Sequence, residues 1–280
     1  MTEIINGKKI RGEILGKIKK EVELLSFQPL FCDVLVGEDP VSKQYVDMKA
    51  RYAERVGIKF YNASFPSKIT TSELIEEIKK INTLENMCGI IVQLPLPEHI
   101  NRREVLDAID SSLDVDCLGV VASEKFYKNE NKIGFPTALS CMELLNSIHV
   151  DLKDKNIIVL GQGELVGRPV SALLRFSGIE PKIITSTTEN KEILIKNADI
   201  IITGIGKGKY ITGNMIKKDV IIIDAGTSES NASIVGDVDF ESVKDVASFV
   251  SPVPGGVGPV TVAMLLNNVL QVAKEKIRKV

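Results

Sequence analysis

The fold of this chain is decided by the stretch Ile157-Ile158-Val159-Leu160-Gly161-Gln162-Gly163-Glu164-Leu165-Val166-Gly167. An apolar, β-branched run that ends in glycines and continues into a helical pattern predicts the first strand, turn and helix of a doubly wound parallel sheet. The glycines permit a tight turn, and the N-terminus of the following helix favours a phosphate. The spacing Gly-x-Gly-x-x-x-Gly is one residue longer than the usual dinucleotide fingerprint, so the motif is a weak signal by itself.

The elements around this stretch alternate between strand and helix. Strands are predicted at 30–36, 59–65, 89–93, 157–160, 182–185, 200–203, 220–224 and 247–250. Helices are predicted through Ile10 to Val22, after Asp39, after Thr71, after Asn101, and at 140–149, 165–176, 191–198, 240–246 and from Val260 onward. The pattern lapses between 111 and 137, where we expect a link between domains with a polar loop at 125–132. This alternation predicts an α/β protein with a small α/β domain and a larger doubly wound sheet.

The composition fits two globular domains and excludes several classes of protein. The chain has 280 residues, 44% of them hydrophobic and 5% aromatic, which favours buried parallel strands. Its 35 basic residues are matched by 37 acidic ones, so we expect no nucleic-acid partner and no membrane surface. No apolar run reaches membrane-spanning length, and no signal peptide is recognisable. Four scattered cysteines predict buried, reduced thiols in a cytoplasmic protein, and two isolated histidines predict no metal site.

Several polar residues stand at positions where they can act on a ligand. On the helix after Asp39, the residues Val41, Tyr45, Met48 and Tyr52 share one face and form an apolar stripe. Lys49 lies one turn after Tyr45 at the edge of that face. A helical lysine is most often solvated, and a catalytic role requires partial burial.

Two further polar positions leave alternatives open. Gln93 ends an apolar strand at the carboxyl end, where parallel sheets bind ligands, although a solvated strand end is equally simple. Asp114 and Asp116 by themselves indicate an Asp-rich turn. The loop from Pro252 to Pro259 holds three glycines and three prolines in eight residues, which predicts a close approach of its backbone to a ligand.

These pieces, in this order, resemble the bifunctional methylenetetrahydrofolate dehydrogenase/methenyltetrahydrofolate cyclohydrolase family. The matching stretches are Val36-Gly37-Glu38-Asp39-Pro40 with Ser42, Tyr45 and Lys49; Val92-Gln93-Leu94-Pro95-Leu96-Pro97; Asp114-Val115-Asp116; Val166-Gly167-Arg168-Pro169; Val235 to Phe240; Pro252 to Pro259; and Thr261 to Leu266. The resemblance covers nearly the whole chain, and the strings at 92–97 and 252–259 are far more specific than a glycine turn.

The resemblance implies an organisation and an activity. Residues 1–138, completed by a C-terminal helix at 259–280, would form a folate-binding catalytic domain. Residues 139–258 would form a Rossmann-type domain for NADP or NAD, with a deep cleft between the two domains. The enzyme would oxidise 5,10-methylenetetrahydrofolate and hydrolyse the methenyl product to 10-formyltetrahydrofolate, in one-carbon metabolism and purine biosynthesis. Relatives are homodimers through the Rossmann domain.

The resemblance also assigns residues. Lys49 and Gln93 would handle proton transfer, Asp116 would hold the pterin, Tyr45 would stack on the folate, and Pro254 and Gly258 would line the other wall of the site. The cofactor would be bound by Thr137, Gly161, Gln162, Gly163, Val166, Ser186, Gly204 and Thr227. No metal is implied.

The sequence departs from the family pattern at four places: Cys117 stands in place of a glycine, 135–138 reads Phe-Pro-Thr-Ala, Gln162-Gly163 replaces Arg-Ser, and Thr227 replaces an isoleucine. Without the arginine, and with no carboxylate after the second strand of the cofactor domain until Glu189, we predict weak discrimination between NADP and NAD. Arg168 and Lys191 are cations near enough in sequence to replace the arginine.

Two other functions remain alternatives from the residues alone. A dehydrogenase resembling shikimate dehydrogenase also uses a lysine and an aspartate, but it does not explain the string at 92–97. A non-catalytic dinucleotide-sensing module predicts that Tyr45, Lys49, Gln93 and Asp116 need not converge.

Overall fold

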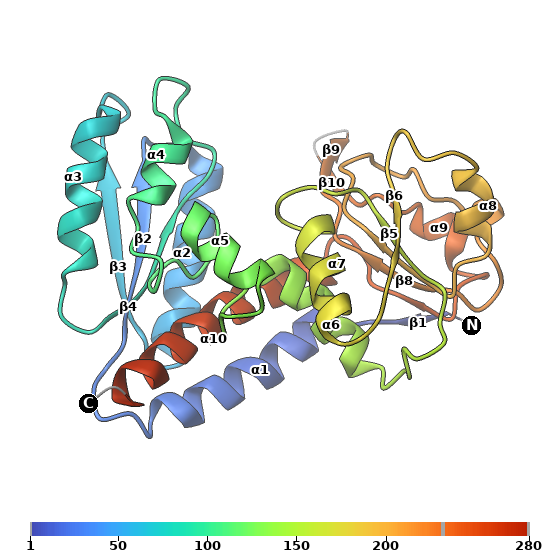
Figure 1. Ribbon diagram of the computed structural model, residues 1–280, viewed down its shortest axis with the longest axis horizontal. Helices are drawn as coiled ribbons and strands as arrows, with labels where there is room; N and C mark the ends of the chain where they lie inside the picture. The colour runs from blue at the N-terminus through green and yellow to red at the C-terminus, as the bar shows by residue number, and fades with distance from the viewer. Residues whose placement is uncertain (1, 231–232, 279–280) are drawn as a thin grey trace. The chain divides into compact units, whose positions relative to one another are not determined.

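The computed structural model describes residues 2–230 and 233–278. It divides into two compact units (Figure 1). The three-stranded unit comprises the chain from Glu13 to Pro136 and from Val262 onward, and the six-stranded unit comprises the chain up to Gly12 and from Thr137 to Thr261. Among the described residues, no helix combines the length and apolar character needed to cross a membrane.

The three-stranded unit is built on a parallel sheet in the order β3-β2-β4. Strand β2 (Leu30–Val36) lies between β3 (Lys59–Phe65) and β4 (Met87–Val92), and every residue of β2 and β4 is buried. Helix α2 (Pro40–Arg55) packs on β2 and β3, while α3 (Thr71–Asn82) packs on β4 and on α4 (Arg102–Asp107). This arrangement brings the carboxyl ends of all three strands to one edge of the sheet.

Polar caps fix where these helices begin. The side chain of Asp39 accepts a hydrogen bond from the backbone N–H of Ser42 at 2.7 Å, and Pro40 occupies the first turn of α2, as predicted. Thr70 caps α3 in a capping box with Glu73, one residue before the predicted signal. Asn101 caps α4, as predicted.

The apolar stripe of α2 is not the face that the helix buries. The buried residues of this helix are Ser42, Val46, Lys49 and Ala53, whereas Val41 and Tyr45 are 60% and 45% exposed. The face of α2 turned toward the sheet therefore includes Lys49, which sequence periodicity places at the edge of the apolar stripe. The helix can bury this cation because polar partners from β2 and from the end of β4 receive it.

The prediction of an irregular link at 111–137 was wrong. This segment contains helix α5 (Val120–Tyr127), and Asp114 bridges to Ile90 of β4. Leu113, Val115, Leu118, Phe126 and Ile133 are all buried. The segment thus belongs to the core of the three-stranded unit, and the next helix, α6 (Pro136–Ser147), begins four residues before its predicted start.

The six-stranded unit is a fully parallel sheet in the order β1-β11-β8-β7-β5-β6 (Figure 1). Its strands are β1 (Glu3–Ile4), β5 (Ile157–Leu160), β6 (Lys182–Ile184), β7 (Ile200–Thr203), β8 (Ile221–Asp224) and β11 (Phe249–Val250). Counted from β5, the order is 2-1-3-4-5 with β1 added at the edge, so the order reverses between β5 and β7. The doubly wound α/β class is confirmed.

Helices and small elements complete the two units. They are α1 (Gly7–Val22), α7 (Gly167–Phe176), α8 (Lys191–Lys196), α9 (Phe240–Val243), α10 (Val257–Arg278), the 3₁₀ turn Gly213–Met215 and the hairpin of β9 (Ser228–Ser230) with β10 (Ser233–Val235). Helix α10 begins three residues before its predicted start. Strand β1 was not predicted, because only two residues pair with β11, which lies far away in sequence.

Candidate functional site

Lys49 is the centre of a polar cluster in the three-stranded unit. Its Nζ atom donates a hydrogen bond to Oε1 of Gln93 at 2.7 Å and lies 2.6 Å from Oδ2 of Asp33. Lys49 is 7% exposed and Asp33 is fully buried. The partial burial that a catalytic lysine requires is therefore present, and the lysine and glutamine expected to act together are in direct contact.

The position of Gln93 follows from the sheet. Its backbone N–H donates to the carbonyl of Val34 at 2.9 Å, which extends the β4 ladder by one residue. Its Nε2 donates to the carbonyl of Leu94 at 2.9 Å. With the amide nitrogen bound in this way, the amide oxygen faces Lys49 and fixes the lysine at the carboxyl end of β4.

Two aspartates follow β4 in the same unit. Asp114 accepts a hydrogen bond from the backbone N–H of Gly119 at 2.7 Å, and burial raises its pKa. Burial raises the pKa of Asp116 to about 7, with Lys49 opposing the rise and Asp114 and Asp33 adding to it. Asp116 therefore belongs to the electrostatic surroundings of Lys49, as the assigned roles require.

Tyr45 lies one turn before Lys49 on α2 and is 45% exposed. An exposed aromatic ring beside this buried polar cluster offers a flat surface to a planar ligand. The stacking role of Tyr45 stays a prediction.

The loop before α10 belongs to the six-stranded unit and has strict backbone requirements. Gly255 has a φ of +118°, a conformation that favours glycine, and the backbone N–H of Gly256 donates to the carbonyl of Pro252 at 2.7 Å. A Cβ atom on Gly256 would lie 2.8 Å from that carbonyl oxygen, whereas one on Gly258 would meet nothing within 4 Å. The ligand contacts of Pro254 and Gly258 stay predictions.

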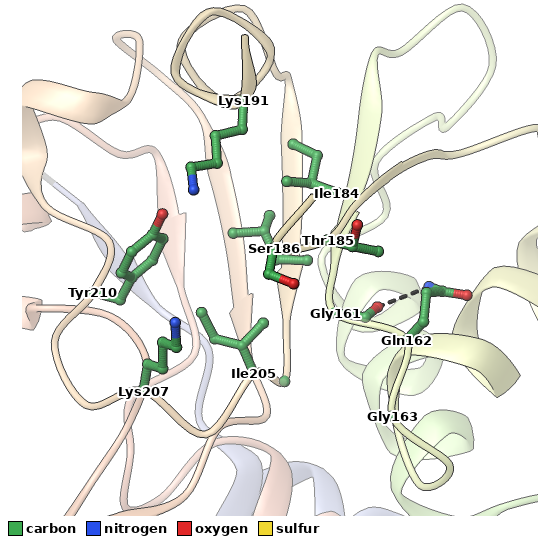
Figure 2. Close-up of a pocket in the computed structure, with 12 residues that line it drawn as sticks. Gly161, Gln162, Gly163, Ile184, Thr185, Ser186, Lys191, Ile205, Lys207 and Tyr210 are labelled. Atoms are coloured by element: carbon green, nitrogen blue, oxygen red, sulfur yellow. Dashed lines mark hydrogen bonds between the residues drawn. The ribbon is translucent and has the colours of Figure 1, made fainter. Parts of the chain in front are cut away.

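A cavity of about 400 Å³ lies at the carboxyl ends of β5, β6 and β7, where the strand order reverses (Figure 2). This is where doubly wound sheets bind their ligands. Five of the eight predicted cofactor residues line it: Gly161, Gln162, Gly163, Ser186 and Gly204. The cavity is also lined by Lys191, Lys207 and Tyr210. In Figure 2 the ammonium groups of both lysines lie on the opposite side of Ser186 from Gln162.

The glycines of the cofactor turn shape this cavity. Gly161 has a φ of +88°, and a Cβ on Gly167 would lie 2.0 Å from the carbonyl oxygen of Gly161. Gln162 donates through Nε2 to that oxygen at 2.7 Å and to Oγ of Ser171 at 3.2 Å. The amide nitrogen of Gln162 is thus occupied by hydrogen bonds within the turn and the following helix. The bare backbone of the turn and the adjacent cations fit a phosphate-bearing dinucleotide.

The other three predicted cofactor residues, Thr137, Val166 and Thr227, are not among the residues lining the cavity. Val166 precedes α7 and would meet a Cβ added to Gly204 at 2.7 Å, so its side chain closes the turn. Thr227 is exposed beside β9, and Thr137 lies in the first turn of α6.

Comparison with known proteins identifies the family of both parts of the chain. The model of the tetrahydrofolate dehydrogenase/cyclohydrolase catalytic domain matches residues 5–116, and that of the NAD(P)-binding domain of the same enzymes matches residues 136–277. The chain belongs to the tetrahydrofolate dehydrogenase/cyclohydrolase family. It is 40% identical to the bifunctional protein FolD of Nautilia profundicola over 281 residues, which cover 99% of each chain.

Solved structures of this family are similar throughout. The bifunctional enzyme FolD of Campylobacter jejuni superposes with a TM-score of 0.94 at 33% identity, covering 99% of this chain and 100% of the other. The enzyme of Trypanosoma brucei, solved with NADP and an inhibitor, gives a TM-score of 0.92 at 32% identity and covers 99% of each chain. The predicted family is therefore confirmed, and the protein is an NAD(P)-dependent enzyme rather than a non-catalytic module or a shikimate-dehydrogenase-like one.

Two departures from the family pattern have structural consequences here. Cys117, at the usual glycine position, is buried with a φ of +59°, so it keeps the backbone conformation that favours glycine. Phe135 packs edge-on against Phe126 with ring centroids 5.0 Å apart, and it fills the core beneath α5. All four cysteines are buried and unpaired, as predicted.

Sequence reasoning missed three carboxylates. Asp237 accepts hydrogen bonds from Oγ1 of Thr203 and from the backbone N–H groups of Ile205 and Lys207, and so it orders the loop after β7. Asp224 accepts from three backbone N–H groups, and burial raises its pKa to about 7. Asp33 carried a visible signal, because it is the single charge in the apolar run 30–36.

Proposed function

We propose that this protein oxidises 5,10-methylenetetrahydrofolate with a nicotinamide cofactor and hydrolyses the methenyl product, with Lys49 as the general base of the hydrolysis. The observation that carries this proposal is the 2.7 Å hydrogen bond from buried Lys49 to Gln93. This part of the chain matches the catalytic domain of the family. We assign folate binding and catalysis to the three-stranded unit, and cofactor binding to the six-stranded unit.

In the first reaction the residues act by positioning. When bound, the nicotinamide cofactor supplies the hydride acceptor. Hydride transfer needs the donor and acceptor carbons about 3–3.5 Å apart, and this demands a fixed folate rather than an acid or base. Tyr45 offers a face for stacking, and Asp116, with its pKa raised to about 7, can hydrogen-bond the pterin in either protonation state near neutral pH.

In the second reaction Lys49 accepts a proton. Water attacks the methenyl carbon, and a neutral Lys49 takes the proton of that water at Nζ. The proton then passes to the departing ring nitrogen as its bond to this carbon breaks, which leaves the formyl product and a neutral Lys49. Gln93 orients Nζ through its amide oxygen, which the hydrogen bond from Gln93 to Leu94 keeps facing the lysine. The positive charge of the methenyl substrate itself favours the neutral form of the lysine at the moment of attack.

For the cofactor we propose that Gly161, Gln162 and Gly163 approach the pyrophosphate through their backbone, while Ser186 lies near the 2′ position of the ribose. Lys191 and Lys207 line the same cavity and supply the positive charge that Gln162 lacks (Figure 2). The Trypanosoma brucei relative was solved with NADP. We propose that both cofactors are used, with these lysines giving NADP whatever advantage it has.

We further propose that the protein is a homodimer assembled through its six-stranded unit and that it acts in the cytoplasm. Four unpaired buried thiols suit a reducing compartment. Light scattering of the purified chain measures the assembly, and a monomer at all concentrations would contradict it.

A spectrophotometric assay tests the function. The purified chain is mixed with methylenetetrahydrofolate and either NADP or NAD, and the reduced nicotinamide and the methenyl product are followed at their own absorbances. Methenyltetrahydrofolate alone is then supplied to follow its hydrolysis. We expect both activities, and the absence of reduced nicotinamide with either cofactor would contradict the proposal.

A further inference from the structure

A single carboxylate lies inside the apolar sheet of the three-stranded unit. Asp33 is in the middle of β2, aligned with Asn62 on β3 and Ile91 on β4, and it is fully buried. Burial raises its pKa, and Lys49 opposes the rise. Burying a charge at the centre of a sheet is costly unless a partner offsets it. The residue that pairs with Asp33 therefore indicates its role.

That partner is the lysine of the active site. Nζ of Lys49 lies 2.6 Å from Oδ2 of Asp33, and among the described residues no aligned hydrogen bond reaches either carboxylate oxygen. The same Nζ donates to Gln93. Asp33 and Gln93 therefore hold the ammonium group between β2 and the end of β4.

Other titratable groups, two aspartates and two thiols, lie around this pair. Asp114 and Asp116 follow β4, and Asp116 interacts with both Lys49 and Asp33. The thiols of Cys32 and Cys117 lie beside the carboxylates, and burial raises the pKa of each thiol far out of the neutral range. Of the three carboxylates, Asp33 is the one at ion-pair distance from Lys49.

We propose that Asp33 is a positioning residue for hydrolysis of the methenyl substrate: its carboxylate holds Nζ of Lys49 in place and favours the ammonium form, so this enzyme hydrolyses its substrate at a higher pH than it would with an uncharged side chain at position 33. This inference rests on the proposed role of Lys49 as the base. A base must be neutral to accept a proton, and a neighbouring anion favours the charged form of a lysine. Hydride transfer uses no base, so its pH dependence does not involve Asp33.

The experiment compares the full-length wild type with Asp33→Asn, which keeps the shape and removes the charge. Initial rates of methenyltetrahydrofolate hydrolysis are measured from weakly acidic to alkaline pH, with the enzyme-free rate subtracted, and dehydrogenase rates are measured over the same series. Asp47→Asn, which changes an exposed carboxylate of α2, the helix that carries Lys49, is the control. We expect the midpoint of the rising limb for hydrolysis to fall by about one pH unit or more in Asp33→Asn. The dehydrogenase profile and the Asp47 variant should match the wild type.

Two results for the Asp33→Asn midpoint would overturn the inference. An unmoved midpoint would mean that Asp33 only fills the sheet, and a midpoint moved to higher pH would mean that Asp33 instead removes a proton from Lys49. If Asp33→Asn does not fold, Asp33→Val restores an apolar strand and is measured in its place. If neither folds, a wild-type midpoint below neutral pH overturns the inference. A wild type without hydrolysis at any pH contradicts the proposed function itself, whereas wild-type hydrolysis with an unmoved midpoint contradicts only the role of Asp33.

Discussion

Lys49 of α2 and Gln93 at the end of β4 are joined by a hydrogen bond of 2.7 Å between Nζ and Oε1, across 44 residues of sequence. The bond is possible because α2 turns Lys49 toward the sheet instead of toward solvent. Helix and sheet thus meet at one side-chain contact, and the base proposed for hydrolysis is held by both.

Lys49→Met should abolish hydrolysis of methenyltetrahydrofolate and leave dehydrogenase activity at least in part, because hydride transfer needs positioning rather than a base. It also leaves Asp33 as an unpaired buried charge, so we expect a loss of about 3–5 kcal/mol in the free energy of unfolding. Urea unfolding and the two rate assays measure these effects. Lys43→Met, an exposed lysine of the same helix, should change neither activity.

The double variant Lys49→Met with Asp33→Val separates stability from chemistry. It removes both charges of the buried pair, so it should recover most of the lost stability while hydrolysis stays absent. Hydrolysis by either Lys49 variant at the wild-type rate would remove Lys49 from its proposed role.

The raised pKa of Asp116 predicts how stability depends on pH. Burial raises its pKa from the ordinary value of 3.8 to about 7 in the folded protein, so between these values the folded state binds the extra proton. The free energy of unfolding should therefore fall as pH rises through this window, relative to an Asp116→Asn variant. Urea unfolding of both proteins at a series of pH values gives the difference.

Asp110 is the control of opposite sign. Hydrogen bonds from Ser112 lower the pKa of Asp110, so its contribution to stability is present above its unfolded value and is lost as pH falls. The difference between wild type and Asp110→Asn should shrink toward acidic pH. An equal slope for the Asp116 and Asp110 differences would contradict the assigned pKa directions.

Gly256→Val tests the loop before α10. A close approach of this loop's backbone to a ligand predicts that the change weakens folate binding more than it lowers the melting temperature. In the structure a Cβ at Gly256 meets the carbonyl of Pro252 and the side chain of Ser251 at 2.8 Å, so we now expect a clear fall in melting temperature as well. Thermal unfolding and the KM for folate measure the two effects.

Gly258→Ala is the companion variant, since a Cβ there meets nothing within 4 Å. Its melting temperature should equal that of the wild type, and a raised KM for folate would support the proposed contact of Gly258. A large loss of stability in Gly258→Ala would show that the first turn of α10 tolerates no side chain at this position for reasons of folding alone.

Cofactor choice depends on the cations of the cavity. We predict weak discrimination between NADP and NAD, and a drop of about tenfold to a hundredfold in kcat/KM for NADP, but not for NAD, in Lys191→Met. Lys182→Met, exposed at the start of β6, is the control. A wild-type preference for NADP of more than about a hundredfold, near 3 kcal/mol, would show that a cation fully replaces the missing arginine.

Strands and helix starts were predicted well where neighbouring residues in the sequence determine them. The strands predicted at Leu30–Val36 and Lys59–Phe65 have these bounds in the structure, and Asp39 with Pro40 fixes the start of α2. Helix α5 was missed because Gly119 offers no side-chain cap and the helix is only eight residues long.

The orientation of α2 could not be predicted from its own sequence. Val41 and Tyr45 continue an apolar period, yet Lys49 is the residue turned inward, because its partners Asp33 and Gln93 come from other strands. The roles of the candidate residues came from the family resemblance. Asp33 escaped notice because an isolated charge in a strand acquires meaning only when its partner across the fold is known.

The carboxylate of Asp237 gives position 207 an unusual value for protein engineering. Asp237 anchors the backbone N–H of Lys207 at 2.8 Å and that of Ile205 at 2.7 Å, so the main chain beside the cofactor cavity is held independently of the side chain at 207. Substitutions of Lys207 can then alter the charge presented to a dinucleotide without moving the loop that presents it. A library confined to this one position would sample cofactor preference on a constant scaffold.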